Sequence, residues 1–155
     1  QQEELRIKED IFNMLVKELD TDPPESIIER ELKFMIEGVK FQIAQSGTKI
    51  EDSGFEPEKA VVEWREKAIF NTKGYMALEA VAQAENIHIT QQDMEGEYEL
   101  LAEQTKQKVE DIQKRIMSNP DSLNQTTTKL LGQKTMNFIY ANCEFEFYKE
   151  EPAKD

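Results

Sequence analysis

Residues Trp64 to Gln104 read "WREKAIFNTKGYMALEAVAQAENIHITQQDMEGEYELLAEQ", and this stretch decides the fold. Its first half is apolar on nearly every side of a helix, which is typical of a helix buried between neighbours. Together with the preceding residues from Pro57, which suits a first helical turn, it predicts a helix over 57–86 that spans about 45 Å. The apolar step from Ile87 to Ile89 should interrupt this helix, and Thr90 should cap the next one.

Around this central helix the sequence predicts shorter helices separated by turn signals. The first ends near Leu19, because the two prolines of "DTDPPES" cannot continue a helix. The second runs from Ser26 to the loop "SGTKIEDSGFEPE", a fifth follows Thr105, and a sixth covers 122–142. We therefore expect an all-α, multi-helical, elongated domain of about six helices, with arm-like helix pairs around the long central helix. The period-two pattern of "CEFEFYKEEPAKD" predicts a short extended tail at the carboxy terminus.

The charge balance of the chain limits its partners. The 155 residues include 32 acidic and 19 basic side chains, which gives a net charge of −13. Such a chain repels a phosphate backbone and an anionic membrane surface, so we expect neither nucleic acid nor a membrane as a partner. No apolar run approaches the roughly 20 residues that a membrane-spanning helix needs. The single cysteine cannot form an internal disulfide, which favours a reducing compartment.

Residues with catalytic or metal-binding chemistry are few. His88 is the only histidine and Cys143 the only cysteine, and they lie far apart in the chain. One of each gives no zinc ligand set, and neither lies in the signature of a Cys/His dyad. We therefore predict no catalytic residues, no metal site, no cofactor and no enzyme activity. His88 is interpreted as a semi-exposed side chain between two helices.

Four stretches together carry a resemblance to a known family. They are "PESIIERE" (Pro24 to Glu31), the opening stretch (Trp64 to Gln104), "VEDIQKRI" (Val109 to Ile116) and "KTMNFIYANC" (Lys134 to Cys143). In order and approximate spacing they resemble the substrate-binding domain of bacterial trigger factor, the ribosome-associated folding chaperone, over nearly the whole chain. The unit of helix, break and helix also resembles, more distantly, the peptide-binding core of SurA-type chaperones.

The resemblance implies an ATP-independent chaperone module that binds unfolded or nascent polypeptides in the bacterial cytoplasm and assists their folding. Full-length members also dock on the ribosome through a Gly-Phe-Arg-x-Gly-Lys loop of an amino-terminal domain and carry a prolyl isomerase domain, and this sequence contains neither. Because the chain opens on "QQEELRIKED", already in helical register, we expect a piece of a longer protein. Residues 1–148 would form the chaperone domain and 149–155 a flexible tail, and the domain could form a weak homodimer.

Apolar side chains that the core does not use are the candidates for client binding. On the second helix two apolar faces lie apart, one through Ile28 and Leu32 and the other through Phe34 and Phe41. Two such faces need two packing partners, or one packing partner and one client polypeptide that covers the other face. The predicted client-binding residues are Ile27, Phe34, Phe41, Phe70, Tyr75, Met136 and Tyr140. The alternative function is a helical adaptor that binds one folded protein in a single contiguous groove.

Overall fold

A computed structural model of the chain describes residues 2–144. Within that range the chain forms seven α-helices and one 3-10 turn, and no strand. In chain order they are α1 (Gln2–Glu18), α2 (Glu25–Gln45), η1 (Ile50–Asp52), α3 (Pro57–Glu63), α4 (Arg65–Ala84), α5 (Gln91–Thr105), α6 (Val109–Ser118) and α7 (Pro120–Asn142). The predicted all-α fold is confirmed, whereas nearly all of the predicted extended tail lies outside the described residues.

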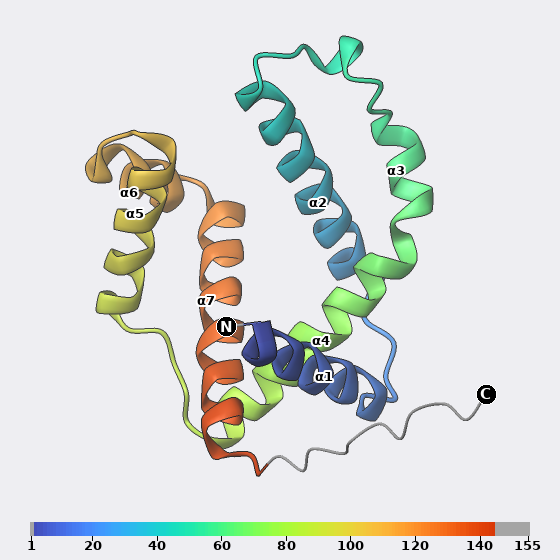
Figure 1. The fold of residues 1–155 in the computed structure, drawn as a ribbon, viewed down its shortest axis with the longest axis vertical. Coiled ribbons are helices and arrows are strands. Elements are labelled where there is room, and N and C mark those ends of the chain that lie inside the picture. The colour runs from blue at the N-terminus through green and yellow to red at the C-terminus, as the bar shows by residue number, and fades with distance from the viewer. Residues whose placement is uncertain (1, 145–155) are drawn as a thin grey trace, which may run out of the picture.

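Two arms extend from a shared base (Figure 1). α4 and the adjacent end of α7 form the base, and α1 lies across α4. α2 and α3 form one arm, with η1 at its tip, while α5 and α6 pack beside the far half of α7 and form the other. The predicted arm-like arrangement around a central helix is therefore present, and α4 is that central helix.

Each arm has its own hydrophobic cluster. The cluster of the α2 arm contains Ile28, Leu32 and Ala68, with Met35, Trp64 and Ile69 packed against them. The cluster of the α5–α6 arm contains Tyr98, Ala102, Ile112 and Ile116, with Met94, Leu101 and Leu123 packed against them. Because the two clusters share no residue, the packing that stabilises one arm is largely separate from the packing that stabilises the other.

The helix predicted over 57–86 is wrong in one respect, because it is interrupted at Trp64. There φ is −94° and ψ is 3°, outside the helical range, so α3 ends at Glu63 and α4 begins at Arg65. The Trp64 ring stacks on Phe55, with 5.7 Å between ring centroids, and also packs against the α2 cluster. The chain changes direction between α3 and α4 (Figure 1), and both helices contact α2. A straight helix would contact α2 around one crossing point only.

The break between α4 and α5 matches the prediction. Thr90 caps α5, since its hydroxyl accepts the Asp93 N–H at 3.3 Å and its own N–H donates to the Asp93 carboxylate at 2.8 Å. From α7, the Lys134 ammonium donates to the Asp93 carboxylate at 2.7 Å and to the His88 carbonyl oxygen at 3.2 Å. Both the cap and the break are therefore fixed to α7.

Asp93 makes this connection sensitive to acid. The hydrogen bond from Lys134, followed by those from the Thr90 N–H and hydroxyl, lowers the pKa of the Asp93 carboxyl from its ordinary value of 3.8 to about 2. A carboxyl whose pKa is lowered by folding stabilises the fold at pH values above its ordinary pKa. This contribution is lost as the pH falls from about 4 to about 2. We therefore expect the stability difference between the unchanged chain and Asp93→Asn to shrink over this window, as measured by urea unfolding at stepped pH.

A second variant checks the partner in the same experiment. Lys134→Met removes the cation that contributes most to the lowered pKa, so its stability deficit should shrink over the same pH window. If the deficit of Asp93→Asn stays constant down to about pH 2, the carboxylate does not hold the break to α7 in solution.

Candidate functional site

A large hollow opens between the two arms. It has a volume of about 1240 Å³ and is open to solvent. Residues of α1, α2, α4, the α4–α5 break and α7 line it. Figure 1 shows α2 and α7 on opposite sides of this region, with α4 joining them at the base. The shape of the hollow therefore depends on how the arms are placed relative to one another.

Apolar side chains line the hollow on its α2 side and along its base. α2 contributes Ile27 and Phe34, and the Phe34 side chain is 46% exposed. α4 contributes Tyr75, Met76 and Leu78. The other apolar lining residues are Leu5, Phe12, Ile87, Ile89, Leu131 and Met136. An apolar ligand that covers this solvent-facing lining removes apolar surface from water, which favours binding.

Tyr75 lies at the contact between this lining and α1. Its ring is edge-on to that of Phe12, with 6.2 Å between centroids. Burial, with a further contribution from the Glu31 carboxylate, raises the pKa of the Tyr75 hydroxyl. Since that pKa is ordinarily about 10, the side chain is neutral at physiological pH. Tyr75 therefore adds an apolar ring and an uncharged hydroxyl to the hollow.

The first half of α7 lines the hollow mainly with uncharged polar side chains, next to Lys129, whereas the apolar Leu131 and Met136 lie further along the helix. Three neighbouring side chains, Asn124, Gln125 and Thr128, line it there, and we call these three residues the polar wall. At 100° per residue they lie within about 100° of one another, on one face of α7. None of the three side chains forms a hydrogen bond with any group in residues 2–144. Their amide and hydroxyl groups can therefore donate to and accept from a ligand.

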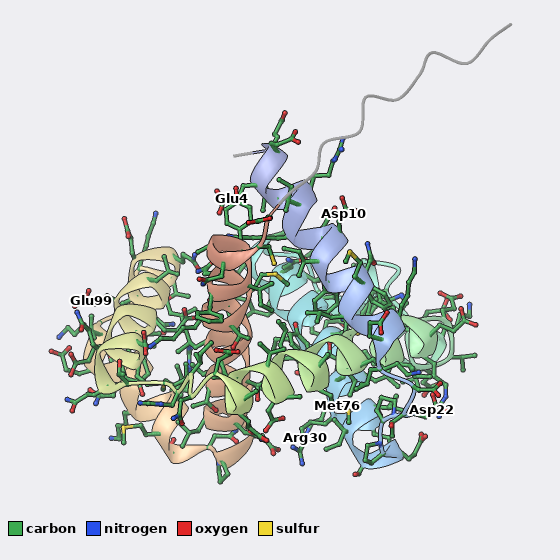
Figure 2. The ribbon with its side chains drawn as sticks, turned by 90° about the horizontal axis from the view of Figure 1, so that it is seen from below. Glu4, Asp10, Asp22, Arg30, Met76 and Glu99 are labelled. Carbon is green, nitrogen blue, oxygen red and sulfur yellow. The ribbon has the colours of Figure 1, made fainter. Side chains whose placement is uncertain are left out.

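Opposite charges nearly balance around the hollow. Its charged lining residues are the basic Lys8, Arg30 and Lys129 and the acidic Glu31 and Glu79. Lys129 donates to Glu97 at 2.6 Å, and Glu31 accepts from the Asn71 amide at 2.9 Å. Figure 2 shows Arg30 with Met76 on the side of α4 opposite α1. The lining thus lacks the strong acidity of the whole chain, whose net charge is −13.

The hollow brings together four of the seven predicted client-binding residues. These four are Ile27, Phe34, Tyr75 and Met136. The other three lie elsewhere: Phe41 is 52% exposed on α2 outside the hollow. The Phe70 ring packs against Phe12, with 5.5 Å between centroids, and the Lys8 ammonium lies 5.2 Å from the centre of the Tyr140 ring. Contact of any of the seven with a client stays a prediction.

Sequence reasoning missed the polar wall and the contribution of α1. Residues 122–129 read "SLNQTTTK" and contain one charge, in a chain of which 33% is charged. This scarcity of charge was the available signal, although uncharged polar residues on a helix are equally typical of a solvated face. On α1, Leu5 is 64% exposed and lines the hollow.

Both residues that the sequence offered for catalytic chemistry are exposed. His88 is exposed in the α4–α5 break, where its Nδ1 lies 3.0 Å from the Asn86 carbonyl oxygen, and Cys143 is exposed after α7. Among residues 2–144 no three His, Cys, Asp or Glu side chains are grouped so as to hold a metal ion. None of the helices in that range combines the length and apolarity needed to cross a membrane.

Fold and hollow together define an all-helical, two-armed domain with an open, partly apolar hollow between its arms. The sequence profile of the family described as "Bacterial trigger factor protein (TF) C-terminus" matches residues 1–141. The trigger factors of Geobacter metallireducens and Citrifermentans bemidjiense are 28% identical over 146 residues and 27% identical over 142 residues. These alignments cover 92% and 89% of the chain, but 34% and 33% of the relatives. The chain therefore spans about a third of the length of these curated relatives. No solved structure gives a significant match.

The chain belongs to the trigger factor family and corresponds to its carboxy-terminal region. The resemblance to trigger factor found in the sequence is thereby confirmed. Membership of this family supports a chaperone role for the domain. The family profile that matches describes the carboxy-terminal region of trigger factor.

Proposed function

We propose that this domain is an ATP-independent chaperone module that binds unfolded or nascent polypeptides and assists their folding. The exposed apolar lining of the hollow carries the proposal, above all Phe34, which is about half exposed. The hollow that it lines has a volume of about 1240 Å³. The domain's own core leaves this lining uncovered, so an unfolded chain can gain by covering it. Family membership supports the same role.

Apolar side chains outside the hollow extend the proposed client surface. Large exposed ones on four different helices are Phe41, Val62, Leu100 and Met117. Dispersed patches suit an unfolded client, because many weak contacts can form and break without a fixed complementary shape. The net charge of −13 favours solubility of the empty protein. Binding of this kind needs neither nucleotide nor cofactor.

The proposal extends to the longer protein and its location. We propose the bacterial cytoplasm as the compartment, with ribosome docking and prolyl isomerisation performed by regions outside this sequence. Residues 1–148 would be the chaperone domain and 149–155 its tail, and a weak homodimer could form. Nucleic acid and membranes are not among the proposed partners, since the chain is strongly acidic.

The alternative is a helical adaptor for one folded protein, and a different observation favours it. Much of the apolar lining is gathered in one contiguous hollow, as a site for a single partner would be. The two functions differ in selectivity: an adaptor recognises the surface of one partner, whereas a holding chaperone binds unrelated unfolded chains.

An aggregation assay separates these functions. We expect the chain, without nucleotide, to suppress light scattering by several unrelated proteins diluted from denaturant. Phe34→Ser should raise the concentration needed for half-suppression about tenfold, because it removes apolar area from the hollow. Phe41→Ser is the matched control, since it makes the same change on the same helix outside the hollow, and its effect should be about threefold or less. Both rings are exposed, so helical circular dichroism should not change.

The possible results distinguish the proposals. Failure to suppress any client while the helical spectrum is intact would sink the chaperone function. Suppression of a single client would favour the adaptor. Equal effects of the two serine substitutions would support holding but show that clients contact the hollow no more strongly than the surface outside it.

A further inference from the structure

We propose that the polar wall of α7 binds the backbone of an extended, uncharged peptide segment. The inference rests on the proposed function and specifies the form of the client. The hollow would then select clients by their free main-chain groups as well as by their apolar side chains. A segment that is already folded would lack one of these two features.

The unpaired groups of the polar wall require a ligand that can form hydrogen bonds. Asn124, Gln125 and Thr128 line the hollow without a hydrogen-bond partner in residues 2–144. A purely apolar ligand that covered them would remove their water without replacing it, which disfavours binding. An unfolded segment can replace that water, because every residue except proline carries one free backbone donor and one free acceptor.

The spacing of the wall matches an extended chain. Asn124 and Thr128 are four residues apart, which places them about 6 Å apart along the axis of α7. Alternate residues of an extended peptide recur about every 6.7 Å and present their backbone groups toward the same edge. Gln125 has a longer side chain beside this pair and can adjust to the difference. A helical ligand bonds its own N–H and C=O groups and offers free ones only at its ends.

The rest of the hollow fits the side chains and the charge of such a segment. Ile27 and Phe34 on α2 face the same hollow from the other arm and can contact the apolar side chains. Charge complementarity indicates a neutral occupant, because the charged lining residues nearly balance although the whole chain is strongly acidic. An uncharged extended segment with alternating apolar side chains therefore satisfies both sides of the hollow.

The test combines two proteins with two peptides. The proteins are the 155-residue chain and its triple variant Asn124→Leu, Gln125→Met, Thr128→Val, which keeps the approximate shapes and removes the hydrogen-bonding groups. The first peptide is an uncharged, dye-labelled probe of about 12 alternating leucine and serine residues, extended by its period-two pattern. The second has the same side chains with ester oxygens in place of the internal backbone N–H groups. Fluorescence anisotropy gives the four dissociation constants.

We expect the ester peptide to bind the unchanged chain about tenfold more weakly than the amide peptide, and the triple variant to bind both within about twofold. An equal ester penalty in both proteins would overturn the proposal, because the lost hydrogen bonds would then lie away from the wall. Tighter binding of the amide peptide by the triple variant would overturn the proposal too. Apolar contact at these three positions would then favour binding more than hydrogen bonds from the polar wall.

Two further outcomes separate this inference from the proposed function. If the amide peptide fails to bind while denatured proteins are still held in the aggregation assay, the inference fails and the proposed function stands. If neither is held, both fail. Tighter binding of a stapled helical peptide of the same composition would overturn the inference in favour of a folded partner.

Discussion

Replacing Ile112 with alanine is expected to cost the α5–α6 arm about 2–5 kcal/mol, because it removes a large side chain from a small cluster. The Ile112 side chain is 0% exposed and packs with Tyr98, Ala102 and Ile116. Since this cluster shares no residue with that of the α2 arm, the loss should open α5 and α6 locally. Native-state hydrogen exchange measures it: amides of α5 and α6 should lose protection while those of α2 and α4 keep theirs.

Ile28→Ala is the matched control, because it removes the same side chain from the cluster of the other arm, where Ile28 is 4% exposed. It should lower protection in α2 and α4 and spare α5 and α6. No residue of α5 or α6 lines the hollow, so Ile112→Ala should also retain most client holding. Equal loss of protection in both arms for both variants would contradict separate packing and show one cooperative unit.

Chain breaks that have their own local chemistry could be predicted from the sequence. The first helix ends before the two prolines, as expected, because proline removes a backbone donor and clashes with the preceding turn. Thr90 followed three residues later by Asp93 is a capping-box pattern, and the structure contains that box. In both places residues next to the break determine the outcome.

The interruption at Trp64 could not be predicted in this way. No proline or glycine lies at that position, and the apolar pattern continues across it. The change of direction accompanies the stacking of Trp64 on Phe55 and its packing against the α2 cluster. Contacts between elements decide such a break, and a local pattern does not reveal them.

The candidate site was predictable residue by residue but not as a shape. The second apolar face of α2 indicated that Ile27 and Phe34 would lie away from its core face, and both line the hollow. The hollow itself exists because two arms and α1 come together, and no single segment encodes their relative placement. The polar wall was missed because asparagine, glutamine and threonine on a helix usually indicate a face in water.

Gly74→Ala should destabilise the protein by about 1–3 kcal/mol, opposite in sign to the usual gain of about 1 kcal/mol when alanine replaces a helical glycine. A Cβ at Gly74 would overlap the ring of Phe12, which α1 places directly against α4. That ring cannot move aside freely, because it also contacts Phe70 and Tyr75, at centroid distances of 5.5 and 6.2 Å. α1 must therefore shift from α4, and urea unfolding should show the loss.

Two comparisons decide whether the Phe12 ring is the cause. Gly38→Ala lies within α2, where an added Cβ meets nothing within 4 Å, so it should stabilise by about 1 kcal/mol. In a Phe12→Ala background the overlapping ring is gone, so Gly74→Ala should also become stabilising. If Gly74→Ala instead stabilises the unchanged chain, α1 is not seated on α4 in solution. The hollow would then lose the side that Leu5 and Phe12 contribute, and the proposed client-binding surface would consist of α2, α4, α7 and the α4–α5 break alone.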